Sequence, residues 1–268
     1  MSRSATVARL AAALILTVLA APASAQNPAT AQNIVVDVPL AAGGSERVLF
    51  AGPATPPAIL MMLAGGDGIV GIGDAGTIGS LTGNFLIRTR GLWLAQGFAV
   101  VILDSPNGAS LNGQRHTSAY ADAIGRAVDF ARTRADGAIW LVGTSAGTTA
   151  AANGAAQLRG KIAGVVLTSS VTRRYTSSET VFDSEPEAIA VPAMIVANQG
   201  DTCPLTPPAD APLIAAWLTR SPRKEVVYVQ SDQIRSPPCE GLSPHGYFGI
   251  ESGVIQRISN WIREVHSH

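Results

Sequence analysis

A serine in the pentapeptide GTSAG, Gly143–Gly147, has the residue type and spacing that most directly suggest chemistry. An apolar stretch, AIWLV, precedes it and a run of Ala and Thr follows, so a strand is expected to lead into the pentapeptide and a helix out of it. The pattern G-x-S-x-G places its serine on a sharp strand-to-helix turn, where larger flanking residues would collide with backbone. A serine at a helix start is also a common N-cap. The strand and helix around Ser145 favour a nucleophile over a simple cap.

A serine nucleophile needs a base, and His245 in SPHGYFG is the candidate. It follows the last expected strand and precedes the last expected helix, where a loop would deliver a side chain to the end of a sheet. The other three histidines fit less well, because one precedes the serine and two lie at the C-terminal end of the chain: His116, His266 and His268.

The base in turn needs an acid to orient it, and Asp201 in ANQGDTC is the candidate. It follows the expected strand at 191–198, and Gly200 before it permits a tight turn. Asp183 and Glu185 are weaker alternatives because they precede that strand. The chain order Ser145, Asp201, His245 is the order expected when a G-x-S-x-G serine uses an acid and a histidine.

The elements that must position these residues alternate between strands and helices. Apolar runs bounded by Gly and Pro, separated by helical periodicity, predict an α/β fold with a mostly parallel eight-stranded sheet covered by helices on both faces. The two opening strands can form an antiparallel edge. Strands are expected at 34–38, 47–50, 58–63, 98–104, 138–143, 162–170, 191–198 and 224–230, and helices at 85–96, 117–134, 145–158, 210–220 and 250–265.

The whole segment 26–268 resembles the alpha/beta-hydrolase family in its strand order, its GTSAG turn, the acid after the penultimate strand and the late histidine. The resemblance implies a Ser145–His245–Asp201 triad and acyl transfer through an acyl-enzyme on Ser145, most simply on a small-molecule carboxylic ester. The same triad serves amide, peptide or thioester hydrolysis, which stays an alternative. The connection at 171–191 is too short for a large cap domain.

The loop after the third strand, GGDGIVGIGDAG, allows two interpretations. Its GIGDAG portion, Gly71 to Gly76, matches the G-x-G-x-x-G of dinucleotide-binding proteins, and Asp104 after the next strand stands where a carboxylate would bind a ribose. That fingerprint should leave the strand directly and open a helix, whereas Gly71 lies well beyond the strand and the following TIGSLTGN is poor helix sequence. A non-catalytic or dinucleotide-binding exported protein is therefore the weaker interpretation.

The second interpretation is an oxyanion loop, because backbone N–H groups in a glycine-rich turn can face a reacting carbonyl oxygen. Gly66 or Asp67 would give one N–H and Ala146, next to the nucleophile, the second. Many members of the family carry His-Gly at this point, whereas this chain has Ala64-Gly65-Gly66-Asp67. The identity of the first donor therefore stays open between Gly66 and Asp67.

The N-terminus predicts export. Arg3 and Arg9 precede the apolar run Ala11–Ala20, and Ala23-Ser24-Ala25 closes it with small residues, as in a secretory signal peptide cleaved after Ala25. The run is shorter than the roughly 20 residues that span a bilayer, so no membrane anchor is expected after cleavage. The expected mature protein is one domain, 26–268, in the periplasm or secreted.

Net charge and motif content limit the kinds of partner and cofactor that the sequence predicts. The formal net charge is +0 and only 14% of residues are charged, so the composition does not indicate a basic surface for nucleic acid. The sequence contains no metal-ligand motif such as H-E-x-x-H and no acidic loop of the calcium-binding type, so neither a metal nor another cofactor is expected. The oligomeric state is left open.

The chain has two cysteines, Cys203 and Cys239, and in an exported protein an even pair predicts a disulfide. Cys203 lies two residues after Asp201, and Cys239 lies shortly before His245. If the triad assembles, the two loops meet at one edge of the sheet. The predicted disulfide would then join the acid loop to the histidine loop.

Overall fold

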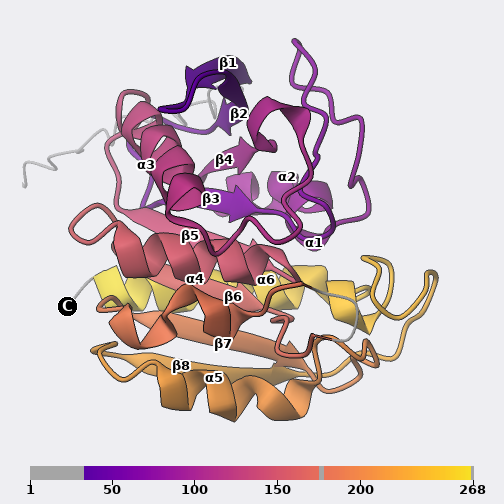
Figure 1. Ribbon diagram of the computed structural model, residues 1–268. Coiled ribbons are helices and arrows are strands. Elements are labelled where there is room, and N and C mark those ends of the chain that lie inside the picture. The colour runs from indigo at the N-terminus through magenta and orange to yellow at the C-terminus, as the bar shows by residue number, and fades with distance from the viewer. Residues whose placement is uncertain (1–32, 175–177, 267–268) are drawn as a thin grey trace, which may run out of the picture.

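The computed structural model describes residues 33–174 and 178–266, and one eight-stranded sheet runs through them (Figure 1). The predicted signal peptide lies outside the described residues. The strands are β1 (Ile34–Pro39), β2 (Ser45–Ala51), β3 (Ile59–Leu63), β4 (Ala99–Leu103), β5 (Ile139–Thr144), β6 (Gly164–Thr168), β7 (Ala193–Asn198) and β8 (Lys224–Val229). Their order across the sheet is β1-β2-β4-β3-β5-β6-β7-β8.

The pairing confirms the expected mostly parallel sheet with an antiparallel edge. β1 pairs antiparallel with β2, and β2 antiparallel with β4. All further pairs, from β4–β3 to β7–β8, are parallel. The carboxyl ends of β3, β5, β6, β7 and β8 therefore lie at one edge of the sheet, which is where open α/β sheets bind ligands.

Helices cover both faces of the sheet, as predicted (Figure 1). The helices are α1 (Phe85–Arg88), α2 (Arg90–Ala95), α3 (Ser118–Arg132), α4 (Gly147–Gln157), α5 (Ala211–Trp217) and α6 (Glu251–His266). Apolar residues of α3, α4 and α5 pack on one face, and those of α1, α2 and α6 on the other. In the parts of the chain that the structure describes, none of the helices has the length and apolarity needed to cross a membrane.

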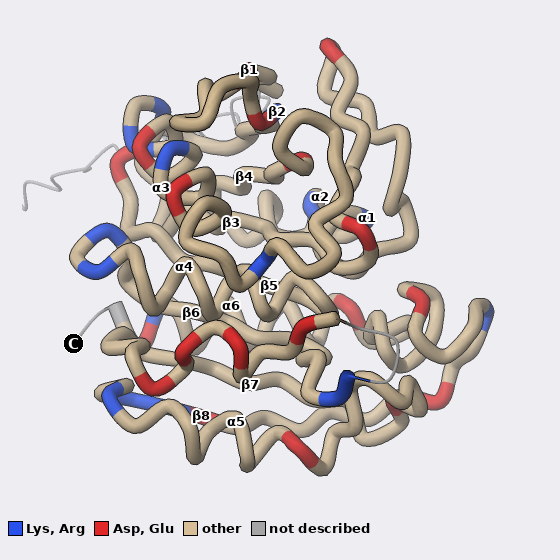
Figure 2. Tube along the Cα trace, in the orientation of Figure 1, with Lys and Arg blue, Asp and Glu red and all other residues tan. Residues whose placement is uncertain are grey.

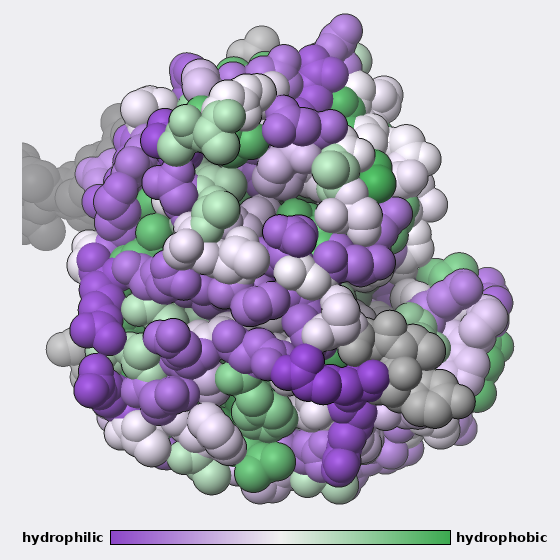
Figure 3. All heavy atoms as spheres, in the orientation of Figure 1, coloured by the Kyte–Doolittle hydropathy of each residue, from purple (hydrophilic) through white to green (hydrophobic). Residues whose placement is uncertain are grey.

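The central strands carry no charged residue, whereas Lys, Arg, Asp and Glu are spread over the surrounding helices and loops (Figure 2). Strands buried on both faces read as continuous apolar runs, which is why the sequence pattern locates them well. The face seen in Figure 3 is mostly hydrophilic. Hydrophobic atoms gather there over α5, the helix that carries the exposed Leu213 and Trp217.

One predicted helix is divided in the structure. The helix expected at 85–96 is interrupted at Thr89, whose hydroxyl donates to the Phe85 carbonyl at 2.6 Å. Such local bonds compete with regular helical geometry. The connection between β6 and β7 contains two short 3-10 helices among its described residues, Val181–Ser184 and Pro186–Ala188. Other 3-10 helices span Pro106–Gly108, Pro208–Asp210 and Pro244–Gly246.

A glutamate in β2 departs from the apolar core around it. Glu46 is fully buried, and neither of its carboxylate oxygens has a hydrogen-bond partner among the described residues. Burial, followed by the negative charge of Asp104, raises the pKa of Glu46 well above its usual value. The folded state therefore holds a proton on Glu46 at pH values where the unfolded chain, with a glutamate pKa of about 4.3, has lost it.

This raised pKa predicts how a Glu46→Gln variant responds to pH. Stability from a raised carboxyl pKa is fully present below the unfolded pKa and is lost as pH rises through the folded pKa. Gln cannot ionise, so the free energy of unfolding of Glu46→Gln relative to the original protein should increase between pH 4 and pH 8. Denaturant unfolding across that range measures the difference. A difference that stays constant with pH would show that Glu46 is not protonated preferentially in the folded state.

Candidate active site

Ser145 lies on the turn between β5 and α4, at the carboxyl end of the sheet, with a positive φ of 54°. Its amide donates to the Thr168 carbonyl of β6 at 3.0 Å, and its carbonyl accepts from Thr148 in the first turn of α4. The N-cap of α4 is Ala146. The interpretation of Ser145 as a simple N-cap is therefore wrong. A non-glycine residue at positive φ is strained and points to a functional turn.

Two glycines let this turn close. A Cβ at Gly147 would lie 2.0 Å from the Leu63 carbonyl oxygen at the end of β3, and one at Gly143 would lie 2.4 Å from the Gly147 carbonyl oxygen. Backbone packs directly on backbone at both positions. The flanking glycines of GTSAG are therefore required by contact as well as by pattern.

Asp201 and His245 come together at the same edge of the sheet, from the loops after β7 and β8. His245 Nδ1 lies 3.0 Å from Asp201 Oδ2, and both side chains are almost completely buried. The Cys203 amide donates to Asp201 Oδ1 at 2.9 Å. An ionised carboxylate only accepts hydrogen bonds, so the Nδ1 of His245 carries the hydrogen. That assignment leaves Nε2 as the free acceptor of the ring.

Thr206 is a site residue that the sequence analysis missed. Its hydroxyl donates to Asp201 Oδ2 at 2.9 Å and lies 3.1 Å from His245 Nδ1, so it touches both members of the pair. Thr206 is buried. Its hydroxyl occupies one acceptor position of the Asp201 carboxylate. Nothing in the local sequence CPLTPP marks this threonine, because its role depends on where two distant loops meet.

The loop that carries His245 is held by side chains from neighbouring strands. Asn198 Nδ2 donates to the Pro244 carbonyl and Ser169 Oγ to the His245 carbonyl, each at 2.8 Å. The structure also contains the expected disulfide between Cys203 and Cys239. The histidine loop is therefore joined to the acid loop by one covalent bond and to the strand ends by two buried hydrogen bonds.

A cavity of ≈ 430 Å³ opens beside the turn, and Ser145, His245 and Gly66 all line it. Its volume lies within the usual range for small-molecule sites. Asp201 does not line this cavity and supports His245 from behind. Phe85, which packs in the core, also forms part of the wall. The remaining lining residues are Leu81, Thr82, Gly83, Asn84, Thr144, Cys239, Glu240, Gly241 and Gly246.

The oxyanion-loop candidates lie against the serine. A Cβ at Gly65 would lie 3.3 Å from Ser145 Oγ, so the loop after β3 touches the turn directly. Gly66 has a φ of +61°, in the left-handed region that glycine tolerates best. Within residues 33–174 and 178–266, the amides of Gly66, Asp67 and Ala146 donate to no other protein group.

The GIGDAG portion of the same loop has a different role from the one a dinucleotide-binding protein would give it. Its glycines form a tight turn that opens no helix: the Gly76 amide donates to the Gly73 carbonyl at 2.8 Å, and beyond the turn the Gly79 amide donates to the Gly71 carbonyl. Two amides of the loop, at Val70 and Ile72, donate to the buried carboxylate of Asp104. The amides of the loop and the carboxylate of Asp104 therefore satisfy each other's hydrogen-bonding groups. Among the described residues no cluster of His, Cys, Asp or Glu is placed to hold a metal ion.

Comparison with known proteins identifies the fold. No protein-family model and no curated protein sequence matches the chain. Solved structures do match: a dienelactone hydrolase from Anabaena variabilis is 16% identical, covers 88% of this chain and 98% of its own, and has a TM-score of 0.58. The chain has the alpha/beta-hydrolase fold. At this level of identity the likeness concerns the fold alone.

Two further solved structures with this fold are named for different activities. An esterase from Pyrococcus furiosus is 11% identical with a TM-score of 0.62, and the match covers 87% of this chain and 91% of that one. The dipeptidyl peptidase 4 of Porphyromonas gingivalis is also 11% identical, with a TM-score of 0.60. That match covers 88% of this chain but 36% of the peptidase. The alpha/beta-hydrolase fold thus accommodates both kinds of protein.

The packing of the turn predicts the effect of Gly147→Ala. The added methyl group would overlap the Leu63 carbonyl, so the free energy of unfolding should fall by about 1–3 kcal/mol or more. Gly91→Ala is a matched control, because Gly91 lies in α2 with open space around its Cβ position. There the added helix propensity should raise stability by about 0.4–1 kcal/mol. Denaturant unfolding compares the two, and equal stability of both variants would contradict the close contact.

The disulfide predicts a linked loss of stability and activity. Its cysteines are 36 residues apart. A loop of that length gives up to about 4 kcal/mol in the chain-entropy model. Cys203→Ser with Cys239→Ser should lower both the free energy of unfolding and the turnover rate, since the bond joins the loops of Asp201 and His245. A reductant should change the original protein in the same direction and leave the double variant unaffected. Two titratable thiols in the denatured, unreduced protein would show that the bond does not form.

Proposed function

We propose that this protein is an exported serine hydrolase that cleaves small carboxylic esters through an acyl-enzyme on Ser145. The observation that carries the proposal is the shared cavity: Ser145 and His245 line it together, and Asp201 holds the far side of the histidine ring. The strained backbone at Ser145 supports the same role. The disulfide is compatible with export, and 26–268 is the proposed mature domain.

In the proposed reaction His245 Nε2 takes the proton of Ser145 Oγ while that oxygen attacks the ester carbonyl carbon. The carbonyl oxygen becomes an oxyanion, for which the amides of Ala146 and of Gly66 or Asp67 are the candidate donors. The ester C–O bond then breaks, and the alcohol leaves with the proton from His245. Water attacks the acyl-enzyme by the same sequence and releases the acid and Ser145.

Amide, peptide or thioester hydrolysis on the same three residues is the alternative. The match to a dipeptidyl peptidase favours keeping it, although that match concerns the fold. The open cavity of ≈ 430 Å³ has no large cap over it among the described residues, which suits small esters. A series of p-nitrophenyl acyl esters of increasing chain length, assayed beside the matching p-nitroanilides, separates the two substrate classes.

The proposal predicts that Ser145→Ala, His245→Ala and Asp201→Asn each remove most ester hydrolysis. The fall in kcat should be about 10⁴-fold or more for Ser145→Ala, and double variants should be little worse than the worst single one, because such residues act as a unit. A fluorophosphonate probe should label the original protein and not Ser145→Ala. Ser80→Ala, in an exposed part of the loop after β3, is the control and should keep full activity and labelling.

The outcomes separate the three candidate functions. Labelling at Ser145 without ester or amide turnover would point to another acyl substrate. Normal turnover in Ser145→Ala, or additive losses in the double variants, would remove the triad from the mechanism. A protein that is neither labelled nor active would be a non-catalytic member of the fold.

A further inference from the structure

The loop that faces Ser145 is held from behind by a buried arginine from a distant part of the chain. Arg115 Nη2 donates to the Gly66 carbonyl at 2.7 Å, and the Arg115 side chain is only 1% exposed. Arg115 lies in the segment between β4 and α3. It does not line the cavity beside Ser145, so it does not face a substrate.

Three successive carbonyl groups of this loop have donors. The Gly65 carbonyl accepts from the Gly68 amide at 3.3 Å and the Asp67 carbonyl from the Leu111 amide at 2.8 Å. The Gly66 carbonyl between them accepts from Arg115. Of these three bonds, only the one at Gly66 comes from a side chain.

The peptide geometry links these carbonyls to the candidate oxyanion donors. In a planar trans peptide the C=O and the following N–H point in opposite directions, and the described residues contain no cis peptide bond. Fixing the Gly65 carbonyl therefore fixes the Gly66 amide, and fixing the Gly66 carbonyl fixes the Asp67 amide. Glycine alone would not hold this arrangement, because it crosses between positive and negative φ with little steric cost.

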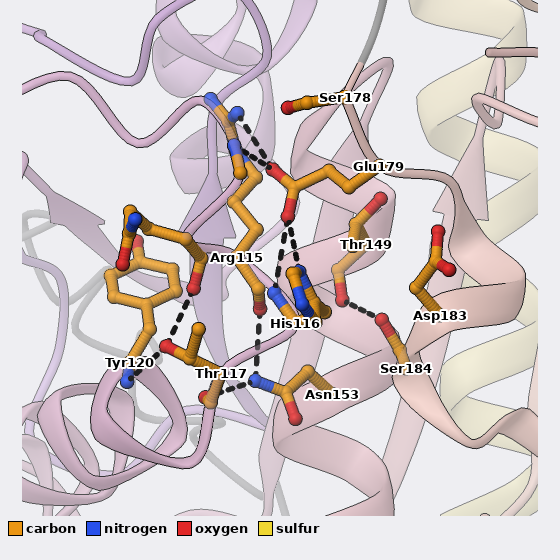
Figure 4. A network of polar contacts seen from close by, with 12 residues as sticks. Arg115, His116, Thr117, Tyr120, Thr149, Asn153, Ser178, Glu179, Asp183 and Ser184 are labelled. Atoms are coloured by element: carbon orange, nitrogen blue, oxygen red, sulfur yellow. Dashed lines mark hydrogen bonds and ion pairs between the residues drawn. The ribbon is translucent and has the colours of Figure 1, made fainter.

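Arg115 is itself held in place by an acidic partner. Its Nη1 lies 3.5 Å from Glu179 Oε1, and the Glu179 side chain is 2% exposed. Figure 4 shows the Arg115 side chain reaching Glu179, with His116 on the opposite side of the same carboxylate. His116 Nδ1 lies 2.9 Å from Glu179 Oε2, and the Gly113 amide donates to Oε1. Burial lowers the pKa of Arg115, and Glu179 is among the groups that oppose this shift.

The backbone of Arg115 is anchored as well. Asn153 Nδ2, on α4, donates to the carbonyls of Arg115 and Thr117 at 2.8 Å each (Figure 4). Since α4 begins at Gly147, two residues after Ser145, the helix that follows the serine also holds the backbone of Arg115. The loop after β3, through Arg115, and the turn at Ser145 are thus both connected to α4.

We propose that Arg115, held by Glu179, is a positioning residue that keeps the Gly65–Asp67 loop in the orientation that presents its amides to Ser145. This inference rests on the function proposed above for Ser145. Without the guanidinium, the Gly66 carbonyl loses its donor, and rotation of the Gly66–Asp67 peptide would replace an amide that donates to the oxyanion by a carbonyl in most molecules. The loss would fall on transition-state stabilisation and leave ground-state substrate binding intact.

The test compares Arg115→Met, Arg115→Lys and Glu179→Gln with the control Arg126→Met. Arg126 is an exposed arginine of α3 that pairs with Asp122. Losing one oxyanion donor costs about 10²–10³-fold in kcat, so a donor misplaced in about 90–99% of molecules should cost about 10–100-fold. Arg115→Met should show this fall in kcat with KM within about threefold and an unchanged pH profile, because the His245–Asp201 pair is untouched. Arg115→Lys, which keeps a donor, should recover part of the loss.

A second readout does not depend on turnover. In ¹⁵N-labelled protein, the heteronuclear NOE of the Gly66, Asp67 and Gly68 amides should fall in Arg115→Met and stay unchanged in Arg126→Met. If Arg115→Met does not fold, Glu179→Gln and Arg115→Lys should show the same changes in smaller degree.

The two readouts separate this inference from the proposed function. Rigid loop amides in folded Arg115 variants, or a kcat and KM equal to those of Arg126→Met, would overturn the positioning role. A fall in kcat accompanied by an equally large rise in KM would also overturn it, since that result indicates general disruption of the site. If the original protein proves inactive on esters while the loop becomes mobile in Arg115→Met, the positioning of the loop stands and the proposed function fails.

Discussion

The turn between β5 and α4 can close only where backbone meets backbone without an intervening side chain, and the rest of the site is built around that closure. Gly147 packs on the Leu63 carbonyl, and Gly143 packs on Gly147. Between them Ser145 is held at a φ of +54°, a conformation that costs of the order of 1–3 kcal/mol and persists only where its surroundings impose it. The surroundings here are the ends of β3 and β6, so the strain at Ser145 is balanced by the packing of the central sheet.

A parallel sheet brings the other site residues to the same edge, but it does not orient them. The loops after β7 and β8 begin side by side, because these two strands are paired. The loop after β8 then runs from the end of that strand at Val229 to His245. Its orientation depends on contacts between residues far apart in the chain: Asn198 and Ser169 hold its backbone, and the Cys203–Cys239 bond ties it to the acid loop. Thr206 then joins the acid and the histidine through one hydroxyl. Long loops at this edge are thereby given the rigidity that a strand or helix would otherwise supply.

The sequence predicts the parts of this arrangement that local patterns encode. Fully buried strands read as apolar runs, and GTSAG follows one of them, so the sheet and Ser145 could be located from spacing. Chain order and elimination led to Asp201 and His245, which the structure brings within hydrogen-bond distance. Thr206 and Arg115 could not be found in this way, since their partners lie in other loops and neither residue belongs to a pattern. The break at Thr89 was missed for a related reason, because a single hydroxyl outweighed an otherwise helical stretch.

Burying the charged pair of Arg115 and Glu179 costs free energy that apolar side chains in the same space would not cost. Removing two charges from water costs several kcal/mol per ion, and well-packed apolar residues of similar volume are often at least as stabilising. What apolar residues cannot do is bind a carbonyl oxygen and a carboxylate at once in fixed directions, which the planar guanidinium does at Gly66 and Glu179. A glycine loop has the freedom to approach Ser145 closely, and the same freedom lets its peptides rotate. Backbone amides restrain the carbonyls of Gly65 and Asp67, whereas the contact at the Gly66 carbonyl comes from outside the loop, from a side chain whose own position is fixed by other partners.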